Sequence, residues 1–549
     1  TQKDPTINID GKTALLGDKV YYRVNIDASR LTDTAYKVWR LGMTDDYDQE
    51  YLALDAKHVE ILDETGRDRT GEFNIQDKDG VLYTFAKTVD TQIPATGETV
   101  PGDPQPDDLK AYGEKTDKDY DPLKDPSIDQ SLLGHTYQVV MPMTVTKVKD
   151  GHTVENTATQ VTNDKRDKTN TVTNPLKEIN PTKDVTVKVG GDSVDGKSVY
   201  LNHTFLYRLD SSILPPGRAY QTVTDWGGTD QLNTEYDQYL GNWAVYASRD
   251  LYRDGQVLAA RGEKIAGSGF DSSKFGGNLF TVDADDNGKV TADATQAYLD
   301  LVSADNEHEA GWVLYLQCKR IAVADEVPNT WTETINGQPR ESNKVVTKTP
   351  DMTPSIHLEK VDTPTLKQEG QEQADRDDPK QALKMDADSI GITFIITNTS
   401  KTDPATGDGA WYKASDLNLD DSTIVGDAHV DMDSLTYPAD WDTLVLKPGE
   451  SVSVTGTLKG VKEGETHTDR AIVTGTPLVE CAPSNGDPFN DKTDGGEDTD
   501  PEYSTGDVTE IDGKQLCADT QTASNTDDWN GYRAKPLAST GVAVLGLAG

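Results

Sequence analysis

The sequence predicts an all-β protein built from tandem β-sandwich domains that follow one another in an elongated chain. Apolar and polar residues alternate in short runs, and Gly, Asn, Asp or Pro closes each run, as in strands joined by turns. Aromatic residues make up 7% of the chain and the mean hydropathy is -0.65, which favours several modest cores over one large core. The length of 549 residues is typical of three or four domains.

The first two predicted domains, residues 1–177 and 178–352, are repeats of one another. A Lys-Asp pair opens both units, at Lys3 and at Lys183. A Thr-Asp pair follows, and its aspartate lies 42 residues after the lysine in each unit, at Asp45 (45 − 3) and Asp225 (225 − 183). Agreement in order and in spacing indicates one structural unit used twice.

Both units also end in the same pattern of asparagines. After a long apolar strand, an Asn-Thr pair occurs at Asn156 in the first unit and at Asn329 in the second. A second asparagine on a Val-rich strand comes 14 residues later, at Asn170 (170 − 156) and Asn343 (343 − 329). The repeat therefore extends from the first strand to the last strand of each unit.

The third predicted domain, residues 353–536, has a different pattern. Strands are expected at residues 392–398, 443–446 and 451–458, and acidic loops separate them. The run Leu446-Lys447-Pro448-Gly449-Glu450-Ser451 resembles the Ig-like repeats of bacterial surface proteins. We expect a third β-sandwich, of Ig-like type.

The charge balance limits the partners. There are 53 basic and 95 acidic residues, which gives a net charge of -42. Such a chain repels nucleic acids and anionic membranes, and the charge suits a soluble, extended surface protein. We expect no nucleic-acid partner.

Three cysteines occur in the chain. Cys318 lies in an apolar strand, where a buried free thiol is expected. Cys481 and Cys517 lie in one polar, Asp-rich stretch and are predicted to pair in an exported protein, closing a loop of 36 residues (517 − 481). No disulfide framework can stabilise the first 300 residues, so their stability is expected to come from another source.

One acidic run is a candidate calcium site. Asp283, Asp285 and Asn287 follow the first half of the EF-hand spacing, but the twelfth position is Ala294 instead of the bidentate Glu. An Asp-Asn-Gly hairpin turn is the favoured interpretation, and Ca²⁺ is the alternative. No cofactor is required.

Sequence signatures of enzymes are absent. His308-Glu309 is not followed by a metalloprotease helix, Gly267-Ser268-Gly269 is not a nucleophile elbow, and no phosphate-binding Gly-Lys-Ser/Thr loop occurs. The eight histidines form no ligand cluster. We expect no enzymatic turnover.

The C-terminal residues resemble the start of a sortase signal. Leu537-Ala538-Ser539-Thr540-Gly541 matches the LPXTG pattern with Ala in place of Pro, and an apolar run follows. Eight residues after the glycine cannot cross a bilayer, which needs about 20. Residues 537–549 are therefore predicted to be a truncated sorting signal, with sortase and peptidoglycan as partners and membrane contact only through the missing anchor. The chain opens at Thr1 without a signal peptide, as expected of a mature segment.

Residues 1–350 resemble the C-terminal domains of the streptococcal antigen I/II adhesins. The resemblance is strongest in the second unit. It is carried by Pro181-Thr182-Lys183-Asp184-Val185, Tyr236-Asp237-Gln238-Tyr239-Leu240-Gly241-Asn242-Trp243, Tyr315-Leu316-Gln317-Cys318-Lys319-Arg320-Ile321 and Glu341-Ser342-Asn343-Lys344-Val345. The first unit keeps Thr44-Asp45-Asp46-Tyr47-Asp48 but lacks the strand that ends in Lys-Arg-Ile.

This resemblance implies a β-sandwich of the isopeptide-forming type, in which a lysine on the first strand condenses with an asparagine on the last strand, assisted by an aspartate. The implied sets are Lys3, Asp45 and Asn170 in the first unit, and Lys183, Asp225 and Asn343 in the second. Asn156 and Asn329 are the rival acceptors. In the third domain the pair to test is Lys360 with Asn525, for which the sequence places no aspartate.

The implied chemistry requires burial. Only a neutral amine attacks a carboxamide, so the lysine pKa must fall from about 10.4, and the aspartate must stay protonated to assist. Ammonia leaves and the reaction runs once, which makes it a self-modification during folding.

The sequence therefore predicts the stalk of a surface adhesin attached covalently to the cell wall of a Gram-positive bacterium. It would mediate attachment to a host or to other microbes through a ligand that the sequence does not identify. One alternative is a sortase-assembled pilus subunit, although Tyr437-Pro438-Ala439 lacks the lysine of the pilin motif. The other is a stalk that displays an upstream enzyme.

Overall fold

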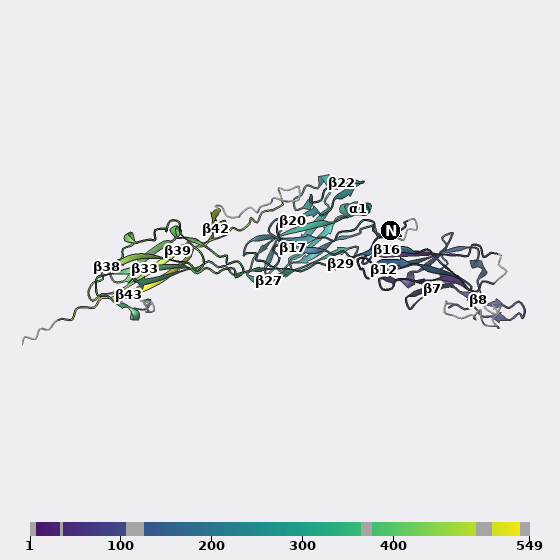
Figure 1. Ribbon diagram of the computed structural model, residues 1–549, viewed down its shortest axis with the longest axis horizontal. Coiled ribbons are helices and arrows are strands. Elements are labelled where there is room, and N and C mark those ends of the chain that lie inside the picture. The colour runs from purple at the N-terminus through teal and green to yellow at the C-terminus, as the bar shows by residue number, and fades with distance from the viewer. Residues whose placement is uncertain (1–6, 33–36, 106–125, 364–375, 490–507, 539–549) are drawn as a thin grey trace, which may run out of the picture.

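The strands form three groups along one long axis (Figure 1). This computed structural model describes residues 7–32, 37–105, 126–363, 376–489 and 508–538. The predicted all-β class is confirmed, because the sheets are almost entirely antiparallel and α1 (Gln296–Ala304) is the only α-helix within those ranges. Three large hydrophobic clusters correspond to the three groups, called here the first, second and third domains.

The first domain packs two main sheets against each other. One sheet contains β2 (Lys19–Asp27), β12 (Thr136–Val145), β4 (Leu52–Leu54) and β5 (Glu60–Asp63). The other has the order β15 (Lys165–Lys168), β14 (Ala158–Thr162), β3 (Leu41–Asp46), β7 (Val81–Ala86) and β6 (Phe73–Lys78). Alternate residues of β2 are buried, as expected of a strand with one face on the core.

Shorter strands complete the first domain. They are β1 (Ala14–Leu15), β16 (Val172–Lys177) and β13 (Thr153–Asn156) in one sheet, and β8 (Thr88–Val89) with β11 (Ser127–Ile128) and β9 (Thr91–Gln92) with β10 (Thr99–Val100) in two pairs. β1 and β16 pair in parallel, so the start and the end of this domain lie side by side.

The second domain repeats this plan with five strands in each main sheet. One sheet has the order β17 (Thr182–Thr186), β18 (Thr204–Asp210), β26 (Trp312–Arg320), β20 (Asp237–Ala247) and β23 (Lys264–Gly267). The facing sheet has the order β24 (Phe280–Ala284), β25 (Lys289–Ala294), β19 (Trp226–Gln231), β28 (Trp331–Ile335) and β29 (Gln338–Glu341). The pairs β21 (Leu251–Arg253) with β22 (Gln256–Ala259) and β27 (Ala324–Asn329) with β30 (Val345–Thr349) are separate.

The third domain is also a sandwich of two four-stranded sheets. They are β31 (Ile356–Asp362), β33 (Ser389–Asn398), β38 (Ser451–Lys459) and β36 (His429–Val430), and β32 (Leu383–Lys384), β43 (Ala523–Tyr532), β39 (Thr466–Gly475) and β35 (Asn418–Val425). Smaller sheets contain β34 (Tyr412–Lys413) with β37 (Val445–Leu446), and β40 (Leu478–Glu480), β42 (Lys514–Ala518) and β41 (Thr509–Ile511).

Polar contacts join the first domain to the second. A backbone bridge pairs Thr13 with Arg218, and the Arg340 guanidinium donates to the Leu16 carbonyl at 3.1 Å. Asp18 lies buried near both arginines, and burial raises its pKa to about 7 although the arginines and the Leu15 amide oppose this.

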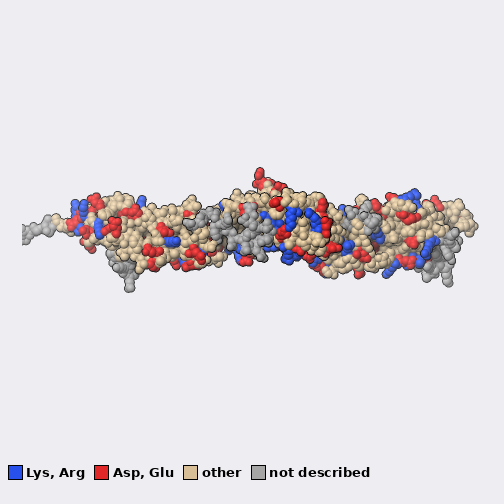
Figure 2. Space-filling view, turned by 90° about the horizontal axis from the view of Figure 1, so that it is seen from above, with Lys and Arg blue, Asp and Glu red and all other residues tan. Residues whose placement is uncertain are grey.

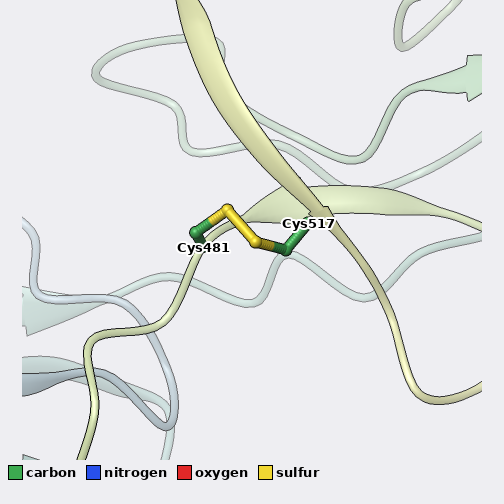
Figure 3. Close-up of a disulfide and its surroundings, with 2 residues drawn as sticks. All are labelled: Cys481 and Cys517. Carbon is green, nitrogen blue, oxygen red and sulfur yellow. A yellow bond between two sulfur atoms is a disulfide. The ribbon is translucent and has the colours of Figure 1, made fainter. Parts of the chain in front are cut away.

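A segment of the third domain reaches back to the second. Cys481 and Cys517 form a disulfide (Figure 3). Beyond Cys481 the chain places Phe489, which is fully buried, in a cluster of second-domain residues. Lys264 donates to the Phe489 carbonyl at 2.8 Å, and Ser198 donates to Asp403 at 2.9 Å. The second and third domains are thus joined by more than the chain that connects them.

The surface is mixed in charge. On the face shown in Figure 2, basic and acidic side chains are interspersed along the molecule, although acidic residues dominate the whole chain. Within the described ranges, no helix has the length and apolar character needed to cross a membrane.

Candidate cross-linking sites

Lys183 lies on β17 with its side chain fully buried between the two sheets of the second domain. Its ammonium contacts the carboxylate of Asp230, which lies on β19 in the facing sheet. The Nζ atom is also 4.5 Å from the centre of the Tyr207 ring. The lysine therefore spans the sandwich and ends in an apolar pocket beside one acid.

Burial shifts both groups toward their neutral forms. Loss of solvation lowers the pKa of Lys183, and the nearby Asp230 charge only partly offsets this effect. Loss of solvation likewise raises the pKa of Asp230 against the opposing charge of Lys183. A neutral amine beside a protonated acid is the state that can attack an amide.

Asn329 completes this site. It is the last residue of β27, it is buried, and it lies close enough to Asp230 to favour the charged form of that carboxyl, which lowers its pKa. Its Oδ1 atom is buried without a hydrogen-bond partner among the described residues. The second domain thus brings together Lys183, Asp230 and Asn329.

Two residues of the predicted second-domain set lie elsewhere, so the predicted roles of Asp225 and Asn343 are wrong. Asp225 is only partly buried, just before β19, and accepts from the Gly337 amide. The Asn343 side chain pairs with the backbone of Lys183, accepting from its N–H at 2.8 Å and donating to its carbonyl at 2.9 Å. It therefore binds the strand and not the Nζ atom.

The first domain has the matching acid and amide. Asp45 on β3 is fully buried and accepts from Nδ2 of Asn156 at 3.2 Å. Burial raises the pKa of Asp45 to about 6, against the lowering effect of the Asn156 hydrogen bond. The predicted acceptor Asn170 is exposed and precedes β16, so its assignment is wrong and Asn156 replaces it. Lys3 lies outside the described residues.

Strand register shows that the two sites are equivalent. Asp45 pairs with Ala158 across β3 and β14, and Asn156 lies two residues before Ala158. Asp230 pairs with Trp331 across β19 and β28, and Asn329 lies two residues before Trp331. The acid and the amide therefore occupy the same pair of positions in both domains.

A sequence signal for the aspartate that contacts the lysine was present. Gly-x-Thr-Asp occurs at residues 42–45 and 227–230. Both glycines are needed for close strand packing, because a Cβ atom would lie 2.1 Å from the Thr84 carbonyl oxygen at Gly42 and 2.2 Å from the Ala292 carbonyl oxygen at Gly227. The sequence prediction used equal spacing from the lysine, and it therefore selected Asp225 instead of Asp230.

The third domain also buries its lysine, but not beside Asn525. That asparagine accepts from the Leu358 N–H at 2.9 Å, so the predicted pair with Lys360 is wrong. Nζ of Lys360 lies 2.5 Å from Oδ2 of Asp421 and 2.5 Å from Oδ1 of Asp469. All three side chains are almost completely buried.

The other predicted sites have simple placements. Cys318 is a buried free thiol. Asp283 lies on β24, and Asp285 opens the turn of the β24–β25 hairpin, where it accepts from the Asn287 amide at 2.9 Å. Within the described residues, no group of three or more His, Cys, Asp or Glu side chains is arranged to hold a metal ion, and Ca²⁺ stays a prediction from the sequence. Of the predicted sorting signal, Leu537 is exposed, Ala538 follows it, and Ser539, Thr540 and Gly541 lie outside the described residues.

Comparison with known proteins identifies the first two domains. Residues 1–176 match the model of the cell surface antigen I/II C2 terminal domain, and residues 180–350 match that of the cell surface antigen C-terminus. An aggregation substance of Enterococcus faecalis is 31% identical over 324 residues, which is 58% of this chain and 21% of the relative. The chain thus spans about a fifth of that protein's length.

Two solved structures are also similar. The C-terminal domain of the antigen I/II polypeptide BspA of Streptococcus agalactiae is 18% identical, with a TM-score of 0.47 over 63% of this chain and 97% of that one. The corresponding domain of AspA of Streptococcus pyogenes is 21% identical, with a TM-score of 0.46 over 62% of this chain and 95% of that one. The two domain matches alone show that residues 1–176 and 180–350 of this chain belong to the C-terminal region of the antigen I/II family of cell-surface antigens.

Proposed function

We propose that the chain is the stalk of a wall-attached surface adhesin, held together by Lys-Asn isopeptide bonds in its first two domains. The bonds are Lys183 to Asn329, assisted by Asp230, and Lys3 to Asn156, assisted by Asp45. The observation that carries this proposal is the register, which gives acid and amide the same two positions in both domains.

The reaction balances without a cofactor. Nζ of neutral Lys183 attacks Cγ of Asn329, and the protonated Asp230 carboxyl hydrogen-bonds the amide that becomes the leaving group. The C–N bond of the carboxamide breaks as Asp230 donates its proton, and ammonia departs. Asp230 then takes up the proton released by the attacking nitrogen. Each site is consumed by its own product, so the protein is not an enzyme that turns over.

Such a bond suits a chain that carries load. Lys183 is on the first strand of its domain, and Asn329 lies 146 residues later (329 − 183), near the end of that domain. A pulling force would pass through the covalent bond and leave most of the intervening strands unloaded. By the loop-closure model for disulfides, a cross-link of this length constrains the unfolded chain by about 5 kcal/mol.

The elongated arrangement in Figure 1 also supports a stalk. Attachment to peptidoglycan by sortase through residues 537–541 would put the third domain nearest the wall. The aggregation substance relative supports a role in adhesion, toward a host surface or another microbe. This role belongs to the longer protein of which the chain would form the base.

The test is the intact mass of the folded chain under reducing conditions, followed by tryptic mapping. One ammonia should be missing for each Lys-Asn bond. Lys183 should be joined to the peptide 321–340, which contains Asn329, and not to the peptide 341–344, which contains Asn343. In the same way, Lys3 should be joined to the peptide 150–165 and not to 169–177. Separate unmodified peptides would contradict the proposal.

A further inference from the structure

The third domain, which lies outside the two matched regions, places two aspartates where the other domains have an aspartate and an asparagine. Asp421 pairs with Ala471 across β35 and β39, and Asp469 lies two residues before Ala471. By this register Asp421 corresponds to Asp45 and Asp230, and Asp469 corresponds to Asn156 and Asn329. The acceptor position is thus a carboxyl group instead of a carboxamide.

The lysine is also in the equivalent place. Lys360 is on β31, the first strand of its domain, and its fully buried side chain crosses from one sheet to the other. Asp421 and Asp469 both lie on the facing sheet, and each has a carboxylate oxygen 2.5 Å from Nζ. A lysine held between two buried carboxyls on the opposite sheet reproduces the Lys183 site, except that a carboxyl oxygen of Asp469 replaces the amide nitrogen of Asn329.

A histidine next to Asp469 distinguishes the surroundings of the two aspartates. Nε2 of the fully buried His467 lies 3.2 Å from Oδ2 of Asp469. Burial alone would raise the pKa of Asp469, but the nearby His467 side chain and the Lys360 charge together hold it below its usual value. Burial raises the pKa of Asp421 to about 6 against the lowering effect of Lys360. These directions agree with the strand register, which puts Asp421 at the position of the assisting acids Asp45 and Asp230.

We propose that Lys360 forms an isopeptide bond with Asp469, assisted by Asp421, so that the third domain is cross-linked by loss of water and not of ammonia. This proposal extends the cross-linking proposed for the first two domains, but it stands on its own residues. A buried lysine between two aspartates is a costly arrangement as a plain ion cluster, because its charges must be desolvated. Condensation removes two of those charges.

The step balances as follows. A proton passes from the Lys360 ammonium to the Asp469 carboxylate, which leaves an amine and a carboxylic acid. Nζ attacks Cγ of Asp469, and the C–O bond breaks as Asp421 donates its proton to the departing hydroxyl, which leaves as water. Asp421 recovers a proton from the attacking nitrogen. His467 touches the acceptor carboxyl and is a positioning residue.

The experiment is a tryptic map of the full wild-type chain, purified folded and then reduced. Lys459 and Lys462 lie between the two aspartates, so Asp421 and Asp469 fall in different peptides, 414–459 and 463–470. We expect Lys360 joined to 463–470, with the mass of one water missing. Recovery of separate Lys360 and Asp469 peptides would overturn the proposal, and a link to 414–459 would overturn the assignment of the acceptor.

Variants distinguish this bond from the other two. Lys360→Met should abolish the loss of water and leave any loss of ammonia from the first two domains unchanged. Lys459→Met is the matched control, because that lysine makes an exposed ion pair with Asp431 in the same domain, and its water loss should persist. Failure of the Lys183 and Lys3 bonds with an intact Lys360 bond would contradict only the proposed function.

Discussion

The second and third domains share one arrangement around a buried lysine, but they differ in the acceptor side chain. Each buries a lysine of its first strand against an acid on the facing sheet, and each places a second group two residues before the strand partner of that acid. The second group is Asn329 in one domain and Asp469 in the other. Strand register is therefore kept where side-chain chemistry changes, which indicates that the position of the acceptor matters more than its leaving group.

Among the substitutions that test this comparison, loss of the lysine should have the largest effect on domain stability. Lys183→Ala removes the cross-link and leaves Asp230 buried without its cation, so we expect the second domain to lose at least about 5 kcal/mol of stability. Thermal unfolding and protease resistance measure this loss. Lys197→Ala is the control, because that lysine is exposed, and its effect should be close to zero. Equal effects of both substitutions would contradict the assigned site.

Removal of the assisting acid should have a somewhat smaller effect. Asp421→Ala keeps Lys360 paired with Asp469 but deprives the reaction of its proton donor, so the third domain should fold without its bond. We expect a loss of about 4.8 kcal/mol, from a closed loop of 109 residues (469 − 360) that is no longer made. Mass spectrometry should show the water retained. A cross-link that still forms would exclude the role of Asp421.

A smaller effect is expected in the pH dependence of the stability of a first domain that lacks its cross-link. In Lys3→Ala, Asp45 keeps a free carboxyl whose pKa of about 6 exceeds its ordinary value of 3.8. The folded state then binds the proton more tightly than the unfolded state, so this contribution is full below about pH 4 and is lost as pH rises to about 6. We expect a decline of roughly 2 kcal/mol in the free energy of unfolding.

Denaturant melts between pH 4 and 7 would measure that decline. Asp45→Asn in the Lys3→Ala background is the matched control and should flatten it. A stability that instead rises over this range in the Lys3→Ala chain would mean that Asp45 is not the proton-binding group.

Exchange of the acceptor side chain should have the smallest effect on stability, but it tests the identity of the acceptor most specifically. A Lys-Asp bond and a Lys-Asn bond give the same amide, so Asp469→Asn should lose ammonia where the wild type loses water. Asn329→Asp should do the reverse in the second domain. In both cases the linked product has the mass and the melting temperature of the linked wild type. An Asp469→Asn chain that stays unlinked would show that the third site depends on its own acceptor.

Part of this arrangement was predictable from the sequence. The repeat in the sequence singled out Lys183 and Asp45, and both side chains are buried at the proposed sites. The third lysine, Lys360, was identified at the start of its domain. The assignments of Asn170 and Asn343 failed because equal spacing cannot tell which of two asparagines faces the core. The structure shows Asn343 bound to backbone and Asn329 buried.

Asp225 failed for a related reason. The correct acid lies 47 residues after its lysine in the second domain (230 − 183) but 42 in the first (45 − 3), because the intervening connection is five residues longer. Offsets counted along a chain include such insertions, whereas the pairing of two strands does not.

The sequence by itself determined the all-β class, the repeat of two units and the lysine that opens each domain, because these depend on local alternation and on order along the chain. Only the tertiary structure decided which acid and which acceptor side chain lie near Lys183 and Lys360. Those contacts join residues as far apart as Lys360 and Asp469, and they depend on strand register and on which face of each strand is buried.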